Sequence, residues 1–188
     1  MILIRHGQSE FNVVYGATRK DPGIRDPRLT ELGRTQAAAA AEALAGHVVG
    51  RVIASPYTRA LETAEIIARR LELPISVEPL VGERAAFTCD IGSSVAELAQ
   101  RWPHLAFDHL ADPWWPTHEE PETALHQRCA AFRRAIATAE DWSEVVVVTH
   151  WGFIRALTGL TVNNCTAVRV DPTQPHLPPE PIHAPGQP

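Results

Sequence analysis

The chain is short of lysine, of cysteine and of long apolar runs, and each shortage argues against a class of protein. Its 188 residues include one lysine, Lys20, against 16 arginines, and the acidic residues outnumber the basic ones by 22 to 17. The resulting net charge of −5 argues against a dedicated nucleic-acid binder, which presents a basic surface. Arginine suits phosphate and carboxylate groups, but its excess over lysine alone decides nothing.

Signals for membranes and for export are also lacking. No apolar run approaches the ~20 residues that span a bilayer, so no membrane partner is expected. The first apolar residues are followed at once by Arg5 and His6, so no secretory leader is expected. The three cysteines, Cys89, Cys129 and Cys165, are odd in number and widely spaced. We therefore expect reduced thiols in a cytoplasmic protein rather than a disulfide framework.

What the chain does contain is an alternation of strand-like and helix-like segments. Residues 1–4, 51–54 and 145–149 are short and almost wholly apolar, which is typical of strands buried on both faces of a mainly parallel sheet. Helical patterns lie between them. In a chain of ordinary globular composition, this alternation predicts an α/β fold, a three-layer α/β/α sandwich around a mainly parallel central sheet.

Four segments are predicted to be helical. Thr30 can cap a helix that runs to about residue 45. Ser55-Pro56 is predicted to start the next helix, whose apolar residues recur at a spacing of about 3.6 residues. Residues 119–140 and 152–160 are the other two candidates.

We expect one domain over residues 1–170, with an insertion and a tail that depart from the strand–helix pattern. Residues 85–118 hold five of the twelve aromatic residues and are predicted to form a loop-and-helix insertion over the active site. The tail, residues 171–188, has seven prolines in 18 residues, which excludes a helix or a central strand. We expect it to lie on a surface, either its own or that of a second copy in a homodimer.

Histidines and arginines follow three of the predicted strands. Arg5 and His6 follow the first, Arg59 lies in the first helical turn after the second, and His150 follows the third. Ligands of open α/β sheets bind beyond the carboxyl ends of the strands, so we expect these four residues to meet. Each alone could be an ordinary structural group. Together they would repel one another unless an anion lies among them, and a helix beginning after His150 would add N–H donors, so the pattern favours a phosphoryl group.

Five sequence blocks occur in an order that is typical of one family. They are LIRHGQS at 3–9 with Asn12 following, LTELGRTQA at 29–37, SPYTRALETA at 55–64, Glu83-Arg84, and VTHWGFIR at 148–155. This set, which includes an Arg-His-Gly (RHG) motif, closely resembles the histidine phosphatase superfamily in its phosphoglycerate mutase-like branch. The resemblance covers residues 1–160. The aromatic insertion and the proline-rich tail lie outside the family pattern.

The resemblance implies phosphoryl transfer through a phosphohistidine intermediate, with neither metal nor other cofactor. His6 would be the nucleophile, attacking as a neutral imidazole. Arg5 and Arg59 would hold the non-bridging oxygens by forked, charge-assisted hydrogen bonds. His150 would donate to the transferring group and so complete its stabilisation.

The remaining site residues implied by the resemblance are polar groups around this core. Asn12 would be a second-tier phosphate contact, and Gln8 or Ser9 could supply others. Glu83 is our choice for the general acid that protonates the leaving oxygen and then activates water. Asp90 is its competitor, and Glu83 could instead be an ordinary loop carboxylate paired with its neighbour.

One residue departs from the family pattern. The family usually has glycine directly after the second histidine, where this chain has Trp151. A large ring at that place could narrow the mouth of the site, stack on a substrate, or pack inward, and the last is the commonest fate of a tryptophan.

We predict a phosphatase, a histidine acid phosphatase-like phosphomonoesterase that acts on a small phosphorylated molecule. A mutase would need further cations, and the insertion offers only Arg101 against four acidic residues. Mutase-type transfer and a phosphate-binding module with little turnover stay as alternatives. A metal enzyme is less favoured because His104, His109 and His118 lack the spacing of a helix-borne site. The substrate itself is not specified by the sequence.

Overall fold

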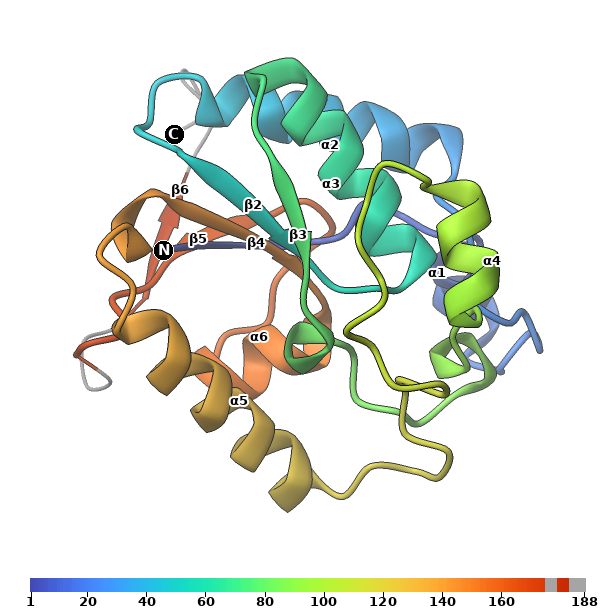
Figure 1. Cartoon of the computed structure of the whole chain (residues 1–188). Coiled ribbons are helices and arrows are strands. Elements are labelled where there is room, and N and C mark those ends of the chain that lie inside the picture. The colour runs from blue at the N-terminus through green and yellow to red at the C-terminus, as the bar shows by residue number, and fades with distance from the viewer. Residues whose placement is uncertain (175–178, 183–188) are drawn as a thin grey trace.

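The computed structural model describes residues 1–174 and 179–182 as a mixed α/β fold (Figure 1). Within that part of the chain, six strands form one sheet in the order β3-β2-β4-β1-β5-β6. The first four in this order run parallel, β5 runs antiparallel to β1, and β6 runs antiparallel to β5, which confirms the predicted mainly parallel sheet. The strands are β1 (Ile2–Arg5), β2 (Arg51–Ala54), β3 (Ile75–Val77), β4 (Val145–Thr149), β5 (Ala167–Arg169) and β6 (Glu180–Ile182).

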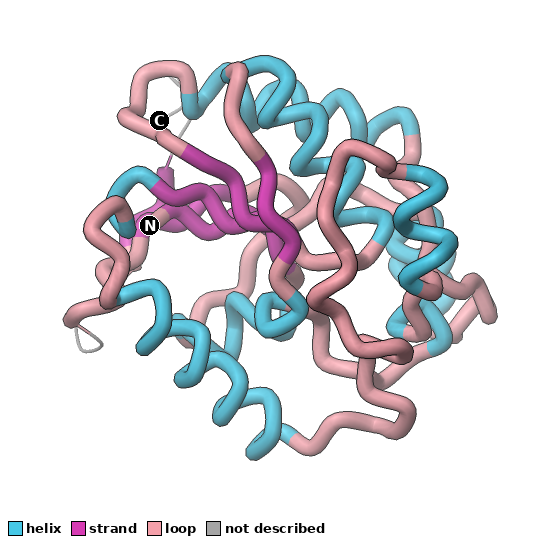
Figure 2. The backbone as a smooth tube through the Cα atoms, in the orientation of Figure 1, coloured by secondary structure: helices cyan, strands magenta, loops and turns pink. Residues whose placement is uncertain are grey.

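Helices cover both faces of this sheet, as the tube in Figure 2 shows most simply. One face carries α2 (Glu31–Leu44) and α3 (Thr58–Leu71), and the other carries α5 (Glu122–Ala137) and α6 (Trp151–Thr158) (Figure 1). Successive residues of a strand point to opposite faces. Ile2 and Ile4 of β1 accordingly pack in the same core cluster as α3, whereas Leu3 packs in the cluster that includes α5 and α6. The predicted three-layer sandwich is confirmed.

The central strands are apolar throughout because both of their faces are covered. All five residues of β4 are buried, and the last of them is a threonine at the carboxyl end. The edge strands are shorter and mixed in character, and β3, β5 and β6 were not among the predicted strands. Three-residue strands carry too few positions for a reliable alternation signal, which explains why the sequence pattern misses them.

Of the predicted helices, α2 begins where the sequence signals it, whereas α3 and α5 begin later than predicted. The prediction for α2 is confirmed, because the Thr30 hydroxyl accepts a hydrogen bond from the Gly33 N–H at 3.0 Å. By contrast, α3 begins at Thr58 and not at Pro56. Asp26 accepts from the Thr58 N–H at 2.9 Å, so a residue distant in sequence supplies the cap. The helix predicted over 119–140 is shorter, at Glu122–Ala137.

Two short helices lie beyond the carboxyl ends of the parallel strands, α1 (Glu10–Thr18) and α4 (Val95–Arg101) (Figure 1). The sequence patterns did not predict α1. Its start is set by a reciprocal pair of hydrogen bonds between Ser9 and Asn12, each side chain bonded to the other's backbone N–H. This pair fixes the chain directly after the RHG motif.

The insertion at 85–118 divides between the core and the neighbourhood of the site. Trp102 and Phe107 are only 4% and 3% exposed and pack in the core cluster with α3. Trp114 packs edge-on against Tyr57, with ring centroids 4.7 Å apart. Phe87, at the start of the insertion, is 40% exposed. Two of its five aromatic residues are therefore ordinary core.

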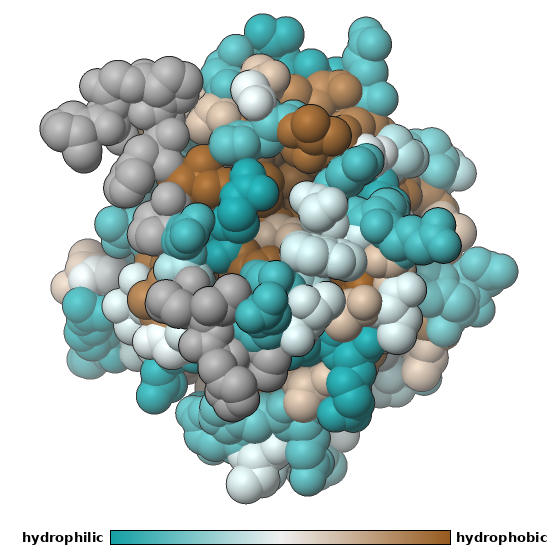
Figure 3. All heavy atoms as spheres, turned by 90° about the vertical axis from the view of Figure 1, so that its left-hand side faces the viewer, coloured by the Kyte–Doolittle hydropathy of each residue, from teal (hydrophilic) through white to brown (hydrophobic). Residues whose placement is uncertain are grey.

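The proline-rich tail contributes one described strand, β6, at the edge of the sheet beside β5. The tail is predicted to form neither a helix nor a central strand, and residues 180–182, which form an edge strand, confirm this. Edge strands tolerate proline. Residues 175–178 and 183–188 lie outside the described part of the chain. Figure 3 shows the face at the left of Figure 1, where hydrophilic residues are spread among smaller apolar areas. No helix within the described ranges is long and apolar enough to cross a bilayer.

Candidate active site

The register of the sheet brings the two predicted histidines together. Arg5 pairs with Thr149 at the carboxyl ends of the parallel strands β1 and β4. The next residue on each strand is a histidine, and the centroids of the His6 and His150 rings lie 5.1 Å apart. The end of β2 is level with the same edge, and Ser55 after it is hydrogen-bonded to His150 Nε2 at 2.8 Å.

His6 is held in one tautomer. Its Nδ1 donates to the Gly7 carbonyl at 2.7 Å, so the proton is on Nδ1 and the lone pair on Nε2. Burial and the nearby charges of Arg59 and Arg5 lower the pKa of His6 well below its usual range. The ring is therefore neutral at pH 7, the state that a nucleophile requires.

The RHG motif needs its glycine because the chain crosses the start of α2 at close range. A Cβ on Gly7 would overlap the Gly33 carbonyl, and a Cβ on Gly33 would overlap the backbone of Gln8. Thr30 N–H also donates to the Gln8 carbonyl at 2.9 Å. Two of the sequence blocks thus meet at one backbone contact that only glycine permits.

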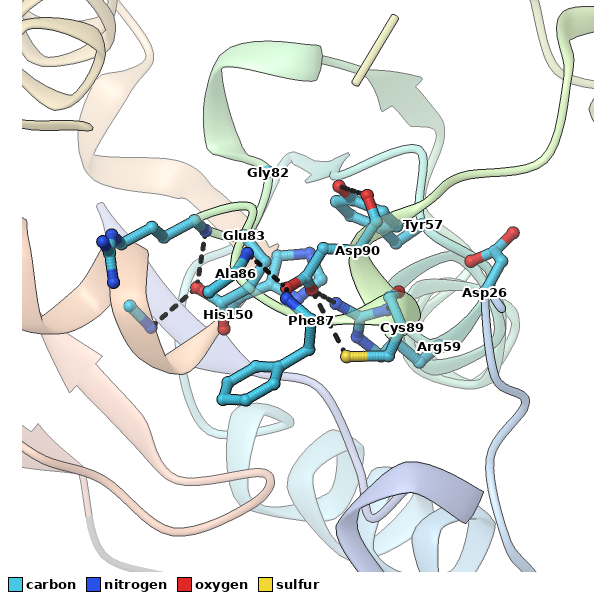
Figure 4. Close-up of polar contacts among 12 residues, drawn as sticks. Asp26, Tyr57, Arg59, Gly82, Glu83, Ala86, Phe87, Cys89, Asp90 and His150 are labelled. Carbon is cyan, nitrogen blue, oxygen red and sulfur yellow. Dashed lines mark hydrogen bonds and ion pairs between the residues drawn. The ribbon is translucent and has the colours of Figure 1, made fainter. Parts of the chain in front are cut away.

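Arg59 is almost fully buried, at 3% exposure, and its charge is balanced by Asp90. Its guanidinium donates to Asp90 Oδ1 at 3.1 Å and to the Cys89 carbonyl at 2.8 Å (Figure 4). The other oxygen of Asp90 accepts from the backbone N–H groups of Ala86 and Phe87, both at 3.0 Å. The expectation that only an anionic ligand could balance the cations is wrong, because Asp90 and neutral histidines already reduce the repulsion.

Glu83 lies at the start of α6, next to His150 (Figure 4). Its Oε1 accepts from the backbone N–H groups of Arg84 and Gly152, both at 2.9 Å. Removal from water, and then the charge of Asp90, raise the pKa of Glu83 to about 7. The α6 N–H that we expected to face a phosphate is thus bonded to Glu83.

Glu83 and Asp90 are the two candidates for the general acid, and Glu83 could instead be paired with Arg84. The contacts of these side chains distinguish the possibilities. The side chain of Arg84 does not pair with Glu83 but binds Glu119 at 2.8 Å and the Glu120 carbonyl at 2.8 Å. Both oxygens of Asp90 are occupied by hydrogen bonds. Among the described contacts, Glu83 Oε2 has none. Glu83 is therefore the freer carboxyl of the two.

His150 is fully buried behind His6, and in the described structure it does not line the cavity. Burial, followed by the charge of Arg59, lowers its pKa well below the usual range. Its Nδ1 has no hydrogen-bond partner within the described chain, and neither has Nε of Arg5. Arg5 uses one terminal nitrogen to donate to the Val162 carbonyl at 2.8 Å. Two buried nitrogens of the site are therefore unsatisfied.

Three further residues, Asn12, Ser9 and Gln8, are predicted to contact the phosphate, and only the first two lie at the cavity. Asn12 and Ser9 line the cavity, and Asn12 Oδ1 accepts from Asn164 Nδ2 at 3.2 Å. The amide oxygen of Gln8 instead accepts from the Thr30 hydroxyl at 2.9 Å, and among the residues described Gln8 is not part of the lining. Gln8 is thus a structural residue at the start of α2.

A cavity of about 550 Å³ opens in front of His6. Trp151 lines it and is 37% exposed, with the Arg155 guanidinium 5.4 Å from its ring centroid. The inward packing that we took as its commonest fate does not occur. Arg19 and Arg84 also line the cavity, so the cations around it come from outside the insertion on which the sequence argument against a mutase relied.

Sequence reasoning missed Arg128, which holds the loop that carries Glu83. From α5 its guanidinium donates to the carbonyls of Leu80, Gly82 and Glu83 at 2.7, 2.8 and 3.3 Å. It also pairs with the buried carboxylate of Glu120 at 2.7 Å. No local motif marks Arg128, since all its partners are distant in sequence except Glu120.

A neutral histidine, two arginines and a carboxyl with a pKa of about 7 thus lie together beyond the carboxyl ends of the parallel strands, a combination suited to phosphoryl chemistry. A sequence model of the histidine phosphatase superfamily (branch 1) matches residues 1–173, and the chain belongs to this family. The resemblance found in residues 1–160 is thus confirmed. Across residues 1–174 and 179–182, no group of three or more His, Cys, Asp or Glu is placed to hold a metal ion.

Individual relatives carry phosphatase and mutase-like names. A glucosyl-3-phosphoglycerate phosphatase from Mycolicibacterium vanbaalenii is 31% identical over an alignment of 176 residues that covers 87% of this chain and 76% of that protein. Phosphoglycerate mutase-like protein 4 from Arabidopsis thaliana is 31% identical over 163 residues, 84% and 68% of the two chains. These names are consistent with a hydrolase of phosphate esters.

Solved structures agree on the fold. A structure titled mycobacterial hydrolase 1 has a TM-score of 0.64 at 26% identity, covering 89% of this chain and 86% of that one. The ecdysone phosphate phosphatase of Bombix mori, solved with tungstate, has a TM-score of 0.68 at 21% identity, covering 100% and 93%. At such low identity the second likeness concerns the fold alone.

Proposed function

We propose that the chain is a phosphatase that hydrolyses a phosphomonoester through a phosphohistidine on His6. The observation that carries the proposal is the state of His6, a neutral ring whose Nδ1 is held by the Gly7 carbonyl and whose pKa is lowered by burial and by the charges of Arg59 and Arg5. The unsatisfied nitrogens of His150 and Arg5 support it, because buried donors without partners are costly and phosphoryl oxygens would bind them.

In the first step, Nε2 of His6 attacks the phosphorus, so that a P–N bond forms as the P–O bond to the leaving alcohol breaks. Arg5 and Arg59 bind the non-bridging oxygens. His150 does not line the empty cavity, but its ring lies 5.1 Å from that of His6, so its unpartnered Nδ1 donates to an oxygen of the phosphoryl group once that group is bound at His6. Protonated Glu83 gives its proton to the leaving oxygen, which departs as a neutral alcohol. A carboxyl with a pKa of about 7 retains that proton in part of its population at neutral pH.

In the second step, water attacks the phosphohistidine. The Glu83 carboxylate takes a proton from the water, the new P–O bond forms, and the P–N bond breaks to release inorganic phosphate. His6 returns to its neutral form. The residues that carry the reaction need no metal, since the arginines supply the charge that stabilises the transferring group.

Mutase-type transfer is the second candidate. Arg19, Arg84 and Arg155 around the cavity favour it, because a mutase substrate brings a second anionic group. The distinction is chemical: a phosphatase passes the phosphoryl group of His6 to water, and a mutase returns it to a hydroxyl of the substrate. Release of inorganic phosphate with each turnover supports the phosphatase, and isomerised phosphate esters support the mutase.

The test is release of inorganic phosphate from p-nitrophenyl phosphate, with and without a chelator, by the wild type and by His6→Ala. Rapid quench in alkali should trap a phosphohistidine that is absent from His6→Ala. Activity that vanishes with chelator, or that survives His6→Ala, would contradict the proposal. Phosphate binding without any phosphorylated His6 would instead indicate a module with little turnover.

A further inference from the structure

We propose that the leaving group of the substrate carries an aromatic or similarly planar apolar ring, which binds against Phe11, Tyr15 and Phe87. This inference rests on the phosphatase function proposed above and concerns the substrate class of the same cavity. We call these three residues the aromatic wall. They line the cavity into which His6 also opens.

The aromatic wall is built by two separate parts of the chain. Phe11 and Tyr15 lie one turn apart on α1 and stack with ring centroids 5.1 Å apart and planes 14° apart. Phe87, from the insertion, meets both at an angle, with centroid distances of 5.5 Å to Phe11 and 5.1 Å to Tyr15. The three rings thus form one continuous apolar surface beside the nucleophile.

Exposure differs along the aromatic wall, because Phe11 is only 8% exposed and supports the other rings, whereas Phe87 is open to the cavity. Phe87 is 40% exposed although it belongs to a ring cluster, and Trp151 at the rim is 37% exposed. Among the described large apolar side chains with such exposure, these two are the aromatic ones, and both line the cavity. Exposed apolar surface that is gathered in a concave site indicates a ligand that covers it.

Arginines extend the aromatic surfaces. The Arg19 guanidinium lies 5.9 Å from the Tyr15 ring centroid, and the Arg155 guanidinium lies 5.4 Å from that of Trp151. A guanidinium plane stacks on rings as an aromatic side chain does. The cavity therefore offers flat surfaces to the leaving group.

Neutral polar side chains are few beside the aromatic wall, and most of the other polar groups of the cavity are charged, among them Arg19, Arg84 and Arg155. The Ser9 hydroxyl caps α1 by accepting from the Asn12 N–H at 3.4 Å, and Asn12 Oδ1 is bonded to Asn164. A sugar ring could stack on one face and reach some of these charged groups, but the hydroxyls that face the aromatic wall would lose water without gaining a partner. An apolar ring has no such cost.

The size of the cavity agrees with a leaving group larger than a short alcohol. Ligand sites occupy roughly 300–1,000 Å³, and this cavity holds about 550 Å³. A phosphoryl group fills a small part of that volume. The remainder accommodates one or two fused rings.

The experiment compares kcat/KM for 2-phenylethyl phosphate, ethyl phosphate and glucose 6-phosphate. All three release alkanol oxygens of broadly similar acidity, so the ratios report binding of the leaving group rather than its chemical reactivity. We expect the phenylethyl ester to exceed both others by about tenfold or more, the effect of about 1.4 kcal/mol of transition-state binding. Phe87→Ala should reduce the ratio of phenylethyl to ethyl ester by severalfold.

Leu32→Ala is the matched control, because Leu32 is an apolar residue on α2 that is even more exposed than Phe87, at 52%, and lies outside the described cavity lining. It should leave the ratio and the basal rate unchanged. Equal or lower kcat/KM for the phenylethyl ester in the wild type, or a preference for glucose 6-phosphate, would overturn the inference while leaving the phosphatase proposal standing. If the wild type hydrolyses none of the three esters and does not hydrolyse p-nitrophenyl phosphate either, the proposed function itself would be overturned.

Discussion

Glu83 and Asp90 are two carboxyls in one site whose surroundings suit them to different chemistry. Both oxygens of Asp90 accept hydrogen bonds, one from Arg59 and the other from two backbone N–H groups. Glu83 keeps one oxygen uncommitted within the described contacts and has a pKa raised to about 7, in part by the charge of Asp90. We infer that Asp90 positions Arg59 and keeps a proton on Glu83.

A pH profile of Asp90→Asn tests this relation. Formation of phosphohistidine needs protonated Glu83, so its rate should fall as pH rises through about 7. Removing the Asp90 charge lowers the pKa of Glu83, and this alkaline limb should move down by about one pH unit. Single-turnover kinetics in rapid quench measure it. An unchanged limb, or one that moves to higher pH, would contradict the relation; Glu83→Gln should lose the limb altogether.

A second prediction at the scale of single residues concerns Gly152. A Cβ at this position would overlap Glu83 Oε1, whose hydrogen bond from the Gly152 N–H is 2.9 Å long. In Gly152→Ala the carboxyl must move, and kcat should fall about tenfold or more, equivalent to about 1.4 kcal/mol of barrier. The control is Gly46→Ala, where a Cβ meets nothing within 4 Å and activity should stay unchanged. Full activity of Gly152→Ala would rule out a dependence on this geometry.

At the scale of elements, α5 and the loop after β3 are joined by Arg128. Three carbonyls of the loop and the Glu120 carboxylate depend on this one guanidinium. Arg128→Met should therefore lower kcat more than it changes KM, because it disturbs Glu83 without touching the phosphoryl oxygens. It should also lower the free energy of unfolding by about 3 kcal/mol, since the buried Glu120 loses its partner.

For Arg128→Met, the informative measurement is whether kcat and KM change by different factors. A purely structural role would reduce the amount of folded enzyme and leave kcat per folded molecule unchanged. Adding Glu120→Gln to Arg128→Met removes the unpaired charge, so it should restore part of the stability but little of kcat. Denaturant titration and steady-state kinetics on the folded fraction separate these outcomes.

The start of α3 depends on a contact between elements rather than on its own sequence. Asp26 accepts from the Thr58 N–H and hydroxyl, and its second oxygen also accepts from the Ser93 N–H at 3.2 Å. Asp26→Ala should lower the free energy of unfolding by about 2 kcal/mol, at the upper end of the range for a lost cap. Asp26→Asn, which keeps an acceptor, should lose less. Equal stability of the alanine variant in urea titration would show that another group caps α3.

At the scale of the whole molecule, the buried ionisable groups of the site lower the free energy of unfolding. The pKa of Glu83 rises from its ordinary value of 4.5 to about 7 on folding, so the folded state is the one that holds this proton more tightly. Its contribution to stability is greatest below pH 4.5 and is lost as pH rises through about 7. The lowered pKa values of His6 and His150 act in the opposite direction, because the unfolded chain binds those protons as pH falls below about 6.5.

A neutral variant isolates the Glu83 contribution. Glu83→Gln should be more stable than the wild type at pH 8, by up to about 3 kcal/mol, and the difference should vanish near pH 4. Thermal or urea unfolding of both proteins across that pH range is the measurement. A difference that stays constant with pH would mean that the glutamine acts through packing and not through the lost charge.

Much of the architecture followed from local patterns. The apolar runs at 51–54 and 145–149 are β2 and β4, and Thr30 begins α2 as its type predicts. The strand ends carried Arg5, His6 and His150 to one edge, because parallel strands share the direction of their carboxyl ends. These features depend on residues close in sequence, so periodicity and capping suffice to find them.

Features that depend on contacts distant in sequence escaped the same reasoning. The Asp90 counterion of Arg59, the exposed position of Trp151 and the Arg128 clamp all join residues from different elements. Their energies come from burial and from hydrogen-bond geometry, which no local spacing encodes. The sequence by itself determined the family, the sheet and the identity of the histidines. Only the tertiary structure decided which charges are balanced, which carboxyl stays free and what the cavity presents to a substrate, because those depend on which groups share the same dry space.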